Sequence, residues 1–288
     1  MNYTAVASPL TVIEPDVQTV PLVFSSAHSG TDYDPHFLAD SRLEPRTLRR
    51  SEDFCVDRLF AAAPDYGAPL LAAHFPRAFC DANREPWELD PQMFEDPLPA
   101  WVNTTSARVG AGLGTIPRVV ASGETIYDQK LRFAEAEERI RRYWEPYHAT
   151  LRGLIEQTVQ RFGICFLIDC HSMPSTMGQS TPDFVLGDAY GTSCDSLLIS
   201  RVEICLRRLG YTVRRNDPYA GGYVTRHYGR PRDGVHALQI EVSRGLYMDE
   251  RRIERHSGFT RLQRNLTDLI AFLAIDGVTS AAPSPLRL

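Results

Sequence analysis

The sequence is poor in several features, and each shortage excludes a class of protein. Its apolar runs, such as residues 164–168, are far shorter than the roughly 20 residues that a membrane-spanning helix needs. The N-terminal segment has neither a basic start nor a continuous apolar core, so we expect no secretory signal. Basic residues number 31 against 36 acidic ones, for a net charge of −5, which argues against a nucleic-acid partner.

Cysteine is also sparse and irregularly spaced. The six cysteines lie at positions 55, 80, 165, 170, 194 and 205, and no pair has the C-x-x-C spacing of zinc knuckles or thioredoxin motifs. A disulfide framework is not expected in a chain of this length without a signal peptide. We therefore expect reduced cysteines and a cytoplasmic protein that does not contact membranes.

The composition is that of a globular α/β protein. The chain has 288 residues, 43% hydrophobic and 23% charged, without internal repeats. Predicted strands alternate with predicted helices, which favours a three-layer α/β fold with a mixed, mostly parallel sheet between helices. No shift in composition marks a boundary. We predict one domain over residues 1–288, with an N-terminal arm at 1–20 and a loose tail at 276–288.

Hydrophobic periodicity places the individual elements. Predicted strands cover residues 21–26, 70–75, 164–168, 184–186, 212–215 and 237–243. Predicted helices cover residues 46–63, 194–209 and a terminal stretch up to 275. Residues 129–161 are predicted as one helix kinked at Pro146 or as two helices that abut there. Residues 85–125 are rich in Pro, Gly, Thr and Ser and have no strong period, which is typical of a lid or rim over a site.

Two histidines directly follow predicted strands. His28 stands in S-S-A-H-S-G after the first strand, and His171 stands in D-C-H-S after the apolar strand at 164–168. Because parallel strands end at one edge of a sheet, both imidazoles can point into one crevice. Imidazole is a common zinc ligand, and a catalytic zinc takes three protein ligands. For each histidine alone, a structural role is the alternative.

A third ligand would be another histidine or a carboxylate. Glu52 and Asp53, adjacent in R-S-E-D-F-C-V-D, are both candidates, and the sequence leaves the choice open. Asp169 lies two residues before His171 and could orient an imidazole through its second nitrogen.

Glu241 is a carboxylate inside a strand that otherwise has interior character. In A-L-Q-I-E-V-S it shares one face with Gln239 and Ser243. A buried carboxylate must pair, bind a metal or stay protonated, because an unpaired buried charge is costly. Glu241 is therefore a candidate general base beside a metal-activated water. The alternative is a buried ion pair with Arg244.

Two arginines bracket the segment R-A-F-C-D-A-N-R. Arg77 or Arg84 could hold a substrate carboxylate in a bidentate fork or stabilise an oxyanion. The alternative is a surface ion pair with Asp81.

The turn N-D-P-Y-A-G-G at residues 216–222 also follows a predicted strand. Its position allows Tyr219 or the backbone of Gly221 and Gly222 to contact a ligand. A plain tight turn explains the same glycines.

Six motifs in order carry a resemblance to a known family. They are S-S-A-H-S-G, E-D-F-C-V-D-R-L, R-A-F-C-D-A-N-R, D-C-H-S, N-D-P-Y-A-G-G and H-A-L-Q-I-E-V-S-R-G-L-Y-M-D-E. Together they resemble the N-formylglutamate amidohydrolase (deformylase) family from about residue 20 to residue 272. The resemblance implies a fold similar to zinc carboxypeptidases, one Zn²⁺ per chain, and hydrolysis of N-formyl-L-glutamate to formate and L-glutamate in histidine degradation.

The resemblance also implies roles for individual residues. Carboxypeptidases have an H-x-x-E motif, but Thr31 stands three residues after His28, so the carboxylate ligand comes from another segment. The implied zinc ligands are His28, Asp53 and His171, with Glu52 as the alternative carboxylate. The implied catalytic base is Glu241. The residues implied to hold a substrate carboxylate are Asn83 and Arg84.

The expected partner is thus a small anionic N-acyl amino acid, and the oligomeric state is open. A different amidohydrolase or carboxypeptidase-like enzyme of the same fold is one alternative. A non-catalytic binding protein of that fold is the other, although it would not need His28, His171 and Glu241 together.

Overall fold

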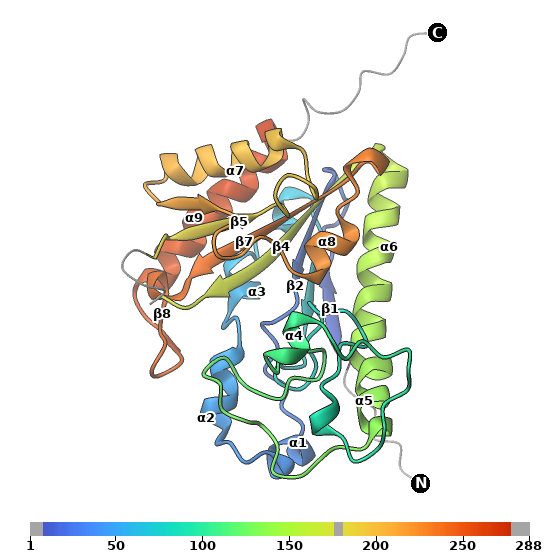
Figure 1. Cartoon of the computed structure of the whole chain (residues 1–288). Helices are drawn as coiled ribbons and strands as arrows, with labels where there is room; N and C mark the ends of the chain where they lie inside the picture. The colour runs from blue at the N-terminus through green and yellow to red at the C-terminus, as the bar shows by residue number, and fades with distance from the viewer. Residues whose placement is uncertain (1–7, 176–180, 278–288) are drawn as a thin grey trace. The chain divides into compact units, whose positions relative to one another are not determined.

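The computed structural model describes residues 8–175 and 181–277, and the tail predicted at 276–288 falls outside them from residue 278 onward (Figure 1). The chain forms a mixed α/β fold. In the part of the chain that the structure describes, no helix is both long and apolar enough to cross a bilayer.

Seven strands form the main sheet, in the order β1-β3-β2-β4-β7-β5-β6. Strand β4 pairs in parallel with both β2 and β7, β5 pairs in parallel with β6, and the β5–β7 pair alone of these is antiparallel. The prediction of a mixed, mostly parallel sheet flanked by helices is confirmed. The strands are β1 (Leu10–Ile13), β2 (Leu22–Ser26), β3 (Leu70–Ala73), β4 (Cys165–Met173), β5 (Phe184–Gly187), β6 (Val213–Arg215) and β7 (Val235–Ser243).

In the second unit, helices flank the sheet (Figure 1). The helices of the described residues are α1 (Pro35–Asp40), α2 (Pro45–Leu48), α3 (Val56–Leu59), α4 (Ala107–Gly110), α5 (Phe133–Arg139), α6 (Glu145–Phe162), α7 (Ser196–Arg208), α8 (Tyr223–Tyr228) and α9 (Gly258–Phe272). A short hairpin, β8 (Met248–Asp249) and β9 (Glu254–Arg255), precedes α9.

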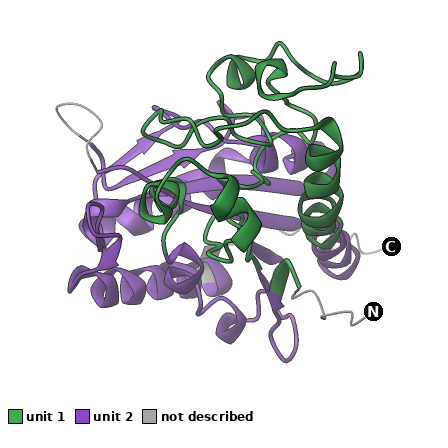
Figure 2. Cartoon of the chain, turned by 90° about the horizontal axis from the view of Figure 1, so that it is seen from below, with its two compact units in different colours: residues 1–11, 27–54, 72–151 green, residues 12–26, 55–71, 152–288 purple. Residues whose placement is uncertain are grey.

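The chain divides into two compact units (Figure 2). The first unit comprises residues 1–11, 27–54 and 72–151, and the second comprises 12–26, 55–71 and 152–288. Each unit is therefore assembled from three separate stretches of sequence.

The second unit holds strands β2, β4, β5, β6 and β7 complete. Every residue of β4 and of β7 is buried, including the polar residues Asp169, His171, Gln239 and Glu241. Helix α9 contacts both α3 and α7. It presents one apolar stripe at helical spacing, formed by Phe259, Leu262, Leu266, Leu269 and Ile270.

The first unit is built mainly from short helices and irregular chain. A hydrophobic cluster holds it together, formed by Phe37, Leu48, Ala78, Val120 and Ile126. Beside it, the guanidinium of Arg139 lies 4.2 Å from the ring centre of Phe79 and donates a 2.6 Å hydrogen bond to the hydroxyl of Tyr127. Residues 85–125 contain α4 and one 3₁₀ turn but are otherwise irregular, as predicted.

Three predicted segments differ from the structure. Residues 10–13, inside the predicted arm, form strand β1 at the edge of the sheet. The long helix starts at Phe133, not at residue 129, and continues past Pro146 to Phe162, which is the one-helix alternative; a π turn over Ile140–Trp144 lies just before the proline. The helix predicted at 46–63 is broken between α2 and α3, and that break shapes the site.

Candidate active site

His28 lies in the loop that follows β2. It is only 1% exposed. Two residues later, the chain passes so close to neighbouring backbone that only glycine fits: a Cβ on Gly30 would lie 2.2 Å from the carbonyl oxygen of Phe75. Asp32 then donates its N–H to the carbonyl of His74. The glycine of the S-G pair after His28 is therefore required by close packing against the backbone, and this packing fixes the path of the loop.

We expect Gly30→Ala to destabilise the protein by about 1–3 kcal/mol, because the added methyl group meets backbone that cannot rotate away. Gly153→Ala in α6 is the matched control, since nothing lies within 4 Å of its Cβ and alanine favours a helix. Thermal unfolding of both variants measures the difference, and equal melting temperatures would contradict the packing argument.

The break in the predicted helix 46–63 brings Asp53 to His28. Glu52 takes an extended conformation, and Cys55 has a positive φ of 57°, so helical hydrogen bonding stops between them. The N–H of Asp53 donates to the carbonyl of His28 (3.0 Å), and the hydroxyl of Ser29 donates to the carbonyl of Asp53 (3.0 Å). These two bonds bring the Asp53 carboxylate to 3.2 Å from Nδ1 of His28.

Glu52 has a different environment from its neighbour. Arg49 donates to both of its carboxylate oxygens, and the hydroxyl of Tyr33 donates to Oε1 at 2.8 Å. Burial, together with the charge of Glu52, raises the pKa of Tyr33 far above its usual value. Because Glu52 is engaged on both oxygens, the geometry favours Asp53 where the sequence left the two open.

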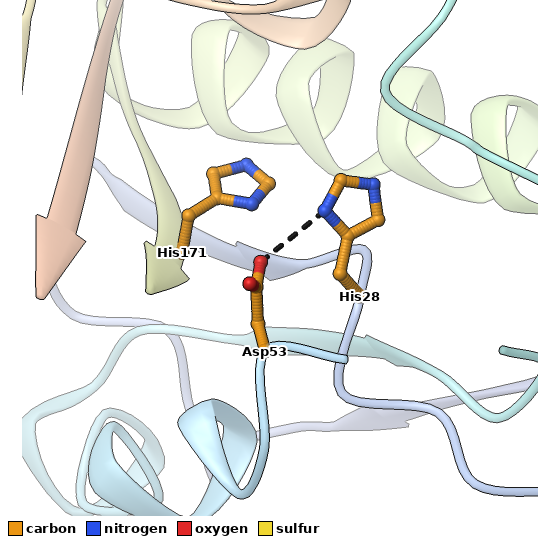
Figure 3. A group of neighbouring side chains, drawn as sticks. All are labelled: His28, Asp53 and His171. Atoms are coloured by element: carbon orange, nitrogen blue, oxygen red, sulfur yellow. Dashed lines mark hydrogen bonds and ion pairs between the residues drawn. The ribbon is translucent and has the colours of Figure 1, made fainter. Parts of the chain in front are cut away.

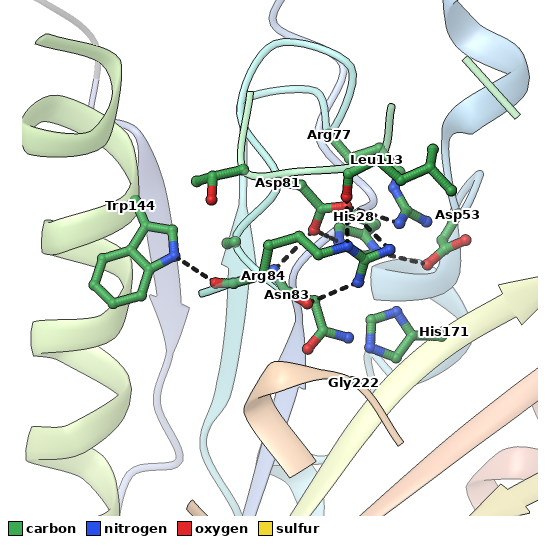
Figure 4. A network of polar contacts seen from close by, with 12 residues as sticks. His28, Asp53, Arg77, Asp81, Asn83, Arg84, Leu113, Trp144, His171 and Gly222 are labelled. Atoms are coloured by element: carbon green, nitrogen blue, oxygen red, sulfur yellow. Dashed lines mark hydrogen bonds and ion pairs between the residues drawn. The ribbon is translucent and has the colours of Figure 1, made fainter. Parts of the chain in front are cut away.

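Asp81 is the centre of the polar network in the first unit (Figure 4). Its Oδ1 accepts from Nε2 of His28 at 2.7 Å and from the N–H of Asn83 at 2.8 Å. Its Oδ2 accepts from Arg77 at 2.8 Å and lies 3.8 Å from Nη2 of Arg84. The ion pair considered as an alternative is thus present, but it is buried and not at the surface, because Asp81 is only 2% exposed.

Charge keeps Asp81 ionised in this setting. Burial raises its pKa, but Arg77, Arg84 and His28 lower it by more, so the net pKa is well below the ordinary value. The position of Asp81 between two arginines in the sequence was a sign that its carboxylate would be paired with them.

Arg84 is held rigidly by backbone carbonyls. Its Nε donates to Leu113 at 2.9 Å, and its Nη1 donates to the carbonyl of Asn83 at 2.8 Å. The indole of Trp144 donates in turn to the carbonyl of Arg84. Burial lowers the pKa of Arg84 to about 10, so the guanidinium stays protonated at neutral pH. A fixed, buried cation of this kind is suited to binding a carboxylate.

In the second unit, His171 lies inside β4 rather than after it. The strand continues five residues beyond the predicted end, to Met173, and includes Asp169, whose Oδ2 is 3.0 Å from Nε2 of His171. The hydroxyl of Ser25 donates to the other oxygen of Asp169. This supports the predicted orienting role of Asp169.

Glu241 lies on the neighbouring strand β7, in register with His171. Its Oε1 accepts a 2.9 Å hydrogen bond from the side-chain amide of Gln239, which the sequence analysis did not single out. Nε of Arg244, the partner considered for Glu241, donates to the hydroxyl of Ser172 at 3.2 Å.

The turn at 216–222 packs tightly within the second unit. Gly221 has a φ of +118°, and a Cβ on Gly187 would come within 2.7 Å of its nitrogen. The N–H of Gly222 already donates to the side chain of Gln239, while Tyr219 is half-buried. The glycines therefore have a packing role as well as any role toward a ligand.

One group of side chains in the described residues could hold a metal ion (Figure 3). His28, Asp53 and His171 are all buried and each offers one ligand atom, and these atoms lie within 4.8 Å of one another. Nε2 of His28 faces Asp81 and Nε2 of His171 lies 3.0 Å from Asp169, while Nδ1 of His28 faces Asp53 at 3.2 Å.

Comparison with known proteins points in one direction. The sequence profile of the N-formylglutamate amidohydrolase family matches residues 20–248. N-formylglutamate deformylase from Pseudomonas aeruginosa is 35% identical over 239 residues, covering 80% of this chain and 83% of that protein. The deformylase of Pseudomonas putida is 32% identical over 240 residues, with the same coverage.

Solved structures agree. The crystal structure of N-formylglutamate amidohydrolase from Ralstonia eutropha matches with a TM-score of 0.88 at 42% identity, covering 93% of this chain and 97% of that one. A protein from Agrobacterium tumefaciens shares the fold with a TM-score of 0.64 at 19% identity, covering 92% and 94%. The chain therefore belongs to the N-formylglutamate amidohydrolase family.

Proposed function

We propose that this protein is a zinc-dependent enzyme that hydrolyses N-formyl-L-glutamate to formate and L-glutamate, as a step of histidine degradation. The observation that carries the proposal is the buried cluster of His28, Asp53 and His171 in a chain whose relatives are named as N-formylglutamate deformylases. The same cluster supports the proposed relation to zinc carboxypeptidases. A cytoplasmic location stays a prediction.

The donor set fits zinc. Two imidazoles and one carboxylate form the ligand set of many catalytic zinc sites, and three protein ligands leave a position for water or substrate. The aspartates beside each Nε2 would hold the orientation of both imidazole rings. When bound, the ion would lower the pKa of a water molecule toward about 7 and polarise the formyl oxygen.

The chain's own side chains would perform the remaining tasks. Glu241 would accept the proton of the attacking water and deliver it to the departing amine. Arg77 is the more exposed of the two arginines that bind Asp81, and it would stabilise the developing oxyanion. Asp81 would hold both arginines and His28 in place at once.

Arg84 and Asn83 would bind a carboxylate of the substrate, with Tyr219 and the turn at 216–222 contacting its remainder. The substrate carries two carboxylates, and fixed cations bind such groups with little loss of side-chain entropy. The preference would thus be for a small diacid over a neutral peptide.

The test is a substrate panel on the purified protein with its metal content measured. We expect about one zinc per chain and formate release from N-formylglutamate, with far lower rates on N-acetylglutamate and short peptides. Preferred cleavage of N-acetylglutamate or of peptides would replace the deformylase with another hydrolase. A folded, metal-loaded chain that cleaves none of them would indicate a binding protein.

Replacing Arg84 by lysine is expected to lower kcat/KM for N-formylglutamate by about 10–100-fold, mainly through KM. An ammonium group cannot reproduce a planar fork, and one lost charge-assisted hydrogen bond accounts for a change of this size. Arg42→Lys, at an exposed pair with Asp128, is the matched control. Parental kcat/KM in the Arg84 variant would remove it from substrate binding.

A further inference from the structure

Gln239 connects two parts of the second unit that the proposed function uses. Its side-chain oxygen accepts from the N–H of Gly222 at 2.7 Å, and its side-chain nitrogen donates to Oε1 of Glu241 at 2.9 Å. It is 3% exposed, so water does not compete strongly for either bond.

The two partners determine the orientation of the amide. Turning it over would set its oxygen against a carboxylate oxygen and its NH₂ group against an N–H, and both contacts are repulsive. The donor of Gln239 is therefore committed to Glu241 and its acceptor to the backbone.

The strand register explains why Gln239 occupies this place. Residues two apart on a strand share a face, so Gln239 and Glu241 lie side by side along β7. On β4, the residues in register with them are Asp169 and His171. Four buried polar side chains thus form two adjacent rows on one face of the sheet.

The backbone N–H of Gly222, which donates to the side chain of Gln239, is also held in place. Gly222 follows Gly221, whose φ of +118° and close approach to Gly187 fix the turn against the end of β5. Arg226 donates its Nε to the carbonyl of Gly221 at 3.1 Å. The N–H of Gly222 therefore has little freedom to follow a moving side chain.

We propose that Gln239 is the positioning residue of Glu241: it ties Oε1 of Glu241 to the Gly222 backbone and so fixes the orientation of the carboxylate that takes the proton. The inference rests on the proposed function. Gln239 contacts neither substrate nor metal in this assignment, and it acts only through the orientation of the Glu241 carboxylate.

The experiment compares Gln239→Met with the parent in steady-state kinetics on N-formylglutamate. Methionine keeps the shape and removes both hydrogen bonds. We expect kcat to fall about 10–100-fold, the size of one hydrogen bond to a charged group, with KM and zinc content nearly unchanged. Gln263→Met on α9, which loses a single bond to the carbonyl of Arg58, is the matched control and should keep parental kcat.

A double-mutant cycle separates positioning from general destabilisation. In a Glu241→Gln background there is no base to orient, so adding Gln239→Met should change the residual kcat by less than about threefold. An equal fall in both backgrounds would overturn the inference, and so would a single variant with parental kcat.

A second variant tests the same inference in case Gln239→Met folds poorly. Gln239→Glu keeps the shape and the acceptor for Gly222 but loses the donor to Glu241, so kcat should again fall, and parental kcat would overturn the inference. Failure of the proposed function gives a different result, because the parent chain would then release no formate, and the inference would fall with it.

Discussion

Glu241→Gln is expected to lower kcat by about 10²–10⁴-fold, the range typical of a lost general base. The substituted amide has nearly the same shape, and its oxygen can still accept from Gln239, so the local structure should persist. What is lost is the capacity to take a proton from water. Zinc should stay bound, because Glu241 is not among the three side chains that could hold the ion.

The control for this variant is Glu203→Gln on α7. Glu203 pairs at the surface with Arg207 and Arg215, so its loss should reduce stability slightly and leave kcat at the parental value. Thermal unfolding, zinc content and kcat are measured together for both variants. A folded, zinc-loaded Glu241 variant with parental kcat would exclude the catalytic role.

The sheet could be predicted because the hydrophobicity of a short segment is enough to identify a buried strand. Strands β4 and β7 are buried on both faces; β4 begins with the apolar run Cys165–Ile168, and apolar residues alternate with polar ones along the second half of β7. The same logic correctly located β2, β5 and β6 to within a residue or two. Strand β1 was missed because it is only four residues long and lies at the edge of the sheet, within a segment that was interpreted as an extended arm.

The helix predicted at 46–63 shows where local signals fail. Its apolar spacing does fit a helix, and tertiary contacts override it: Asp53 bonds to the backbone of His28, and Cys55 takes a left-handed conformation. Apolar spacing depends only on the residues of the segment itself. It therefore does not predict that the break places the Asp53 carboxylate beside His28 and the Glu52 carboxylate beside Arg49.

The polar support of the site was harder to predict than its ligands. His28 and His171 were found because histidines at strand ends are unusual. Asp81 and Gln239 were not assigned, since an aspartate between arginines and a glutamine in an alternating strand both have common surface roles. The roles proposed for them rest on burial and on hydrogen-bond partners that are distant in sequence or set by strand register, and only the folded chain reveals these.

The adjacent pair Glu52 and Asp53 gives the sharpest test of the metal site. Asp53→Asn is expected to weaken zinc binding by more than about 100-fold, because even a residue that only supports a ligand costs 10–100-fold when lost. Activity should fall in proportion to the zinc that is lost. The fold should survive, since the two hydrogen bonds that fix this residue use its backbone.

Glu52→Gln is the control one residue away, with the same change of charge. It breaks the pairing with Arg49, so the free energy of unfolding should fall by about 1–3 kcal/mol, whereas zinc affinity should stay within a few-fold of the parent. Added zinc at 100 times its Kd should stabilise the parent and the Glu52 variant by about 2.7 kcal/mol, but not the Asp53 variant. The reverse pattern would make Glu52 the ligand, because only the residue that binds the ion links zinc concentration to unfolding.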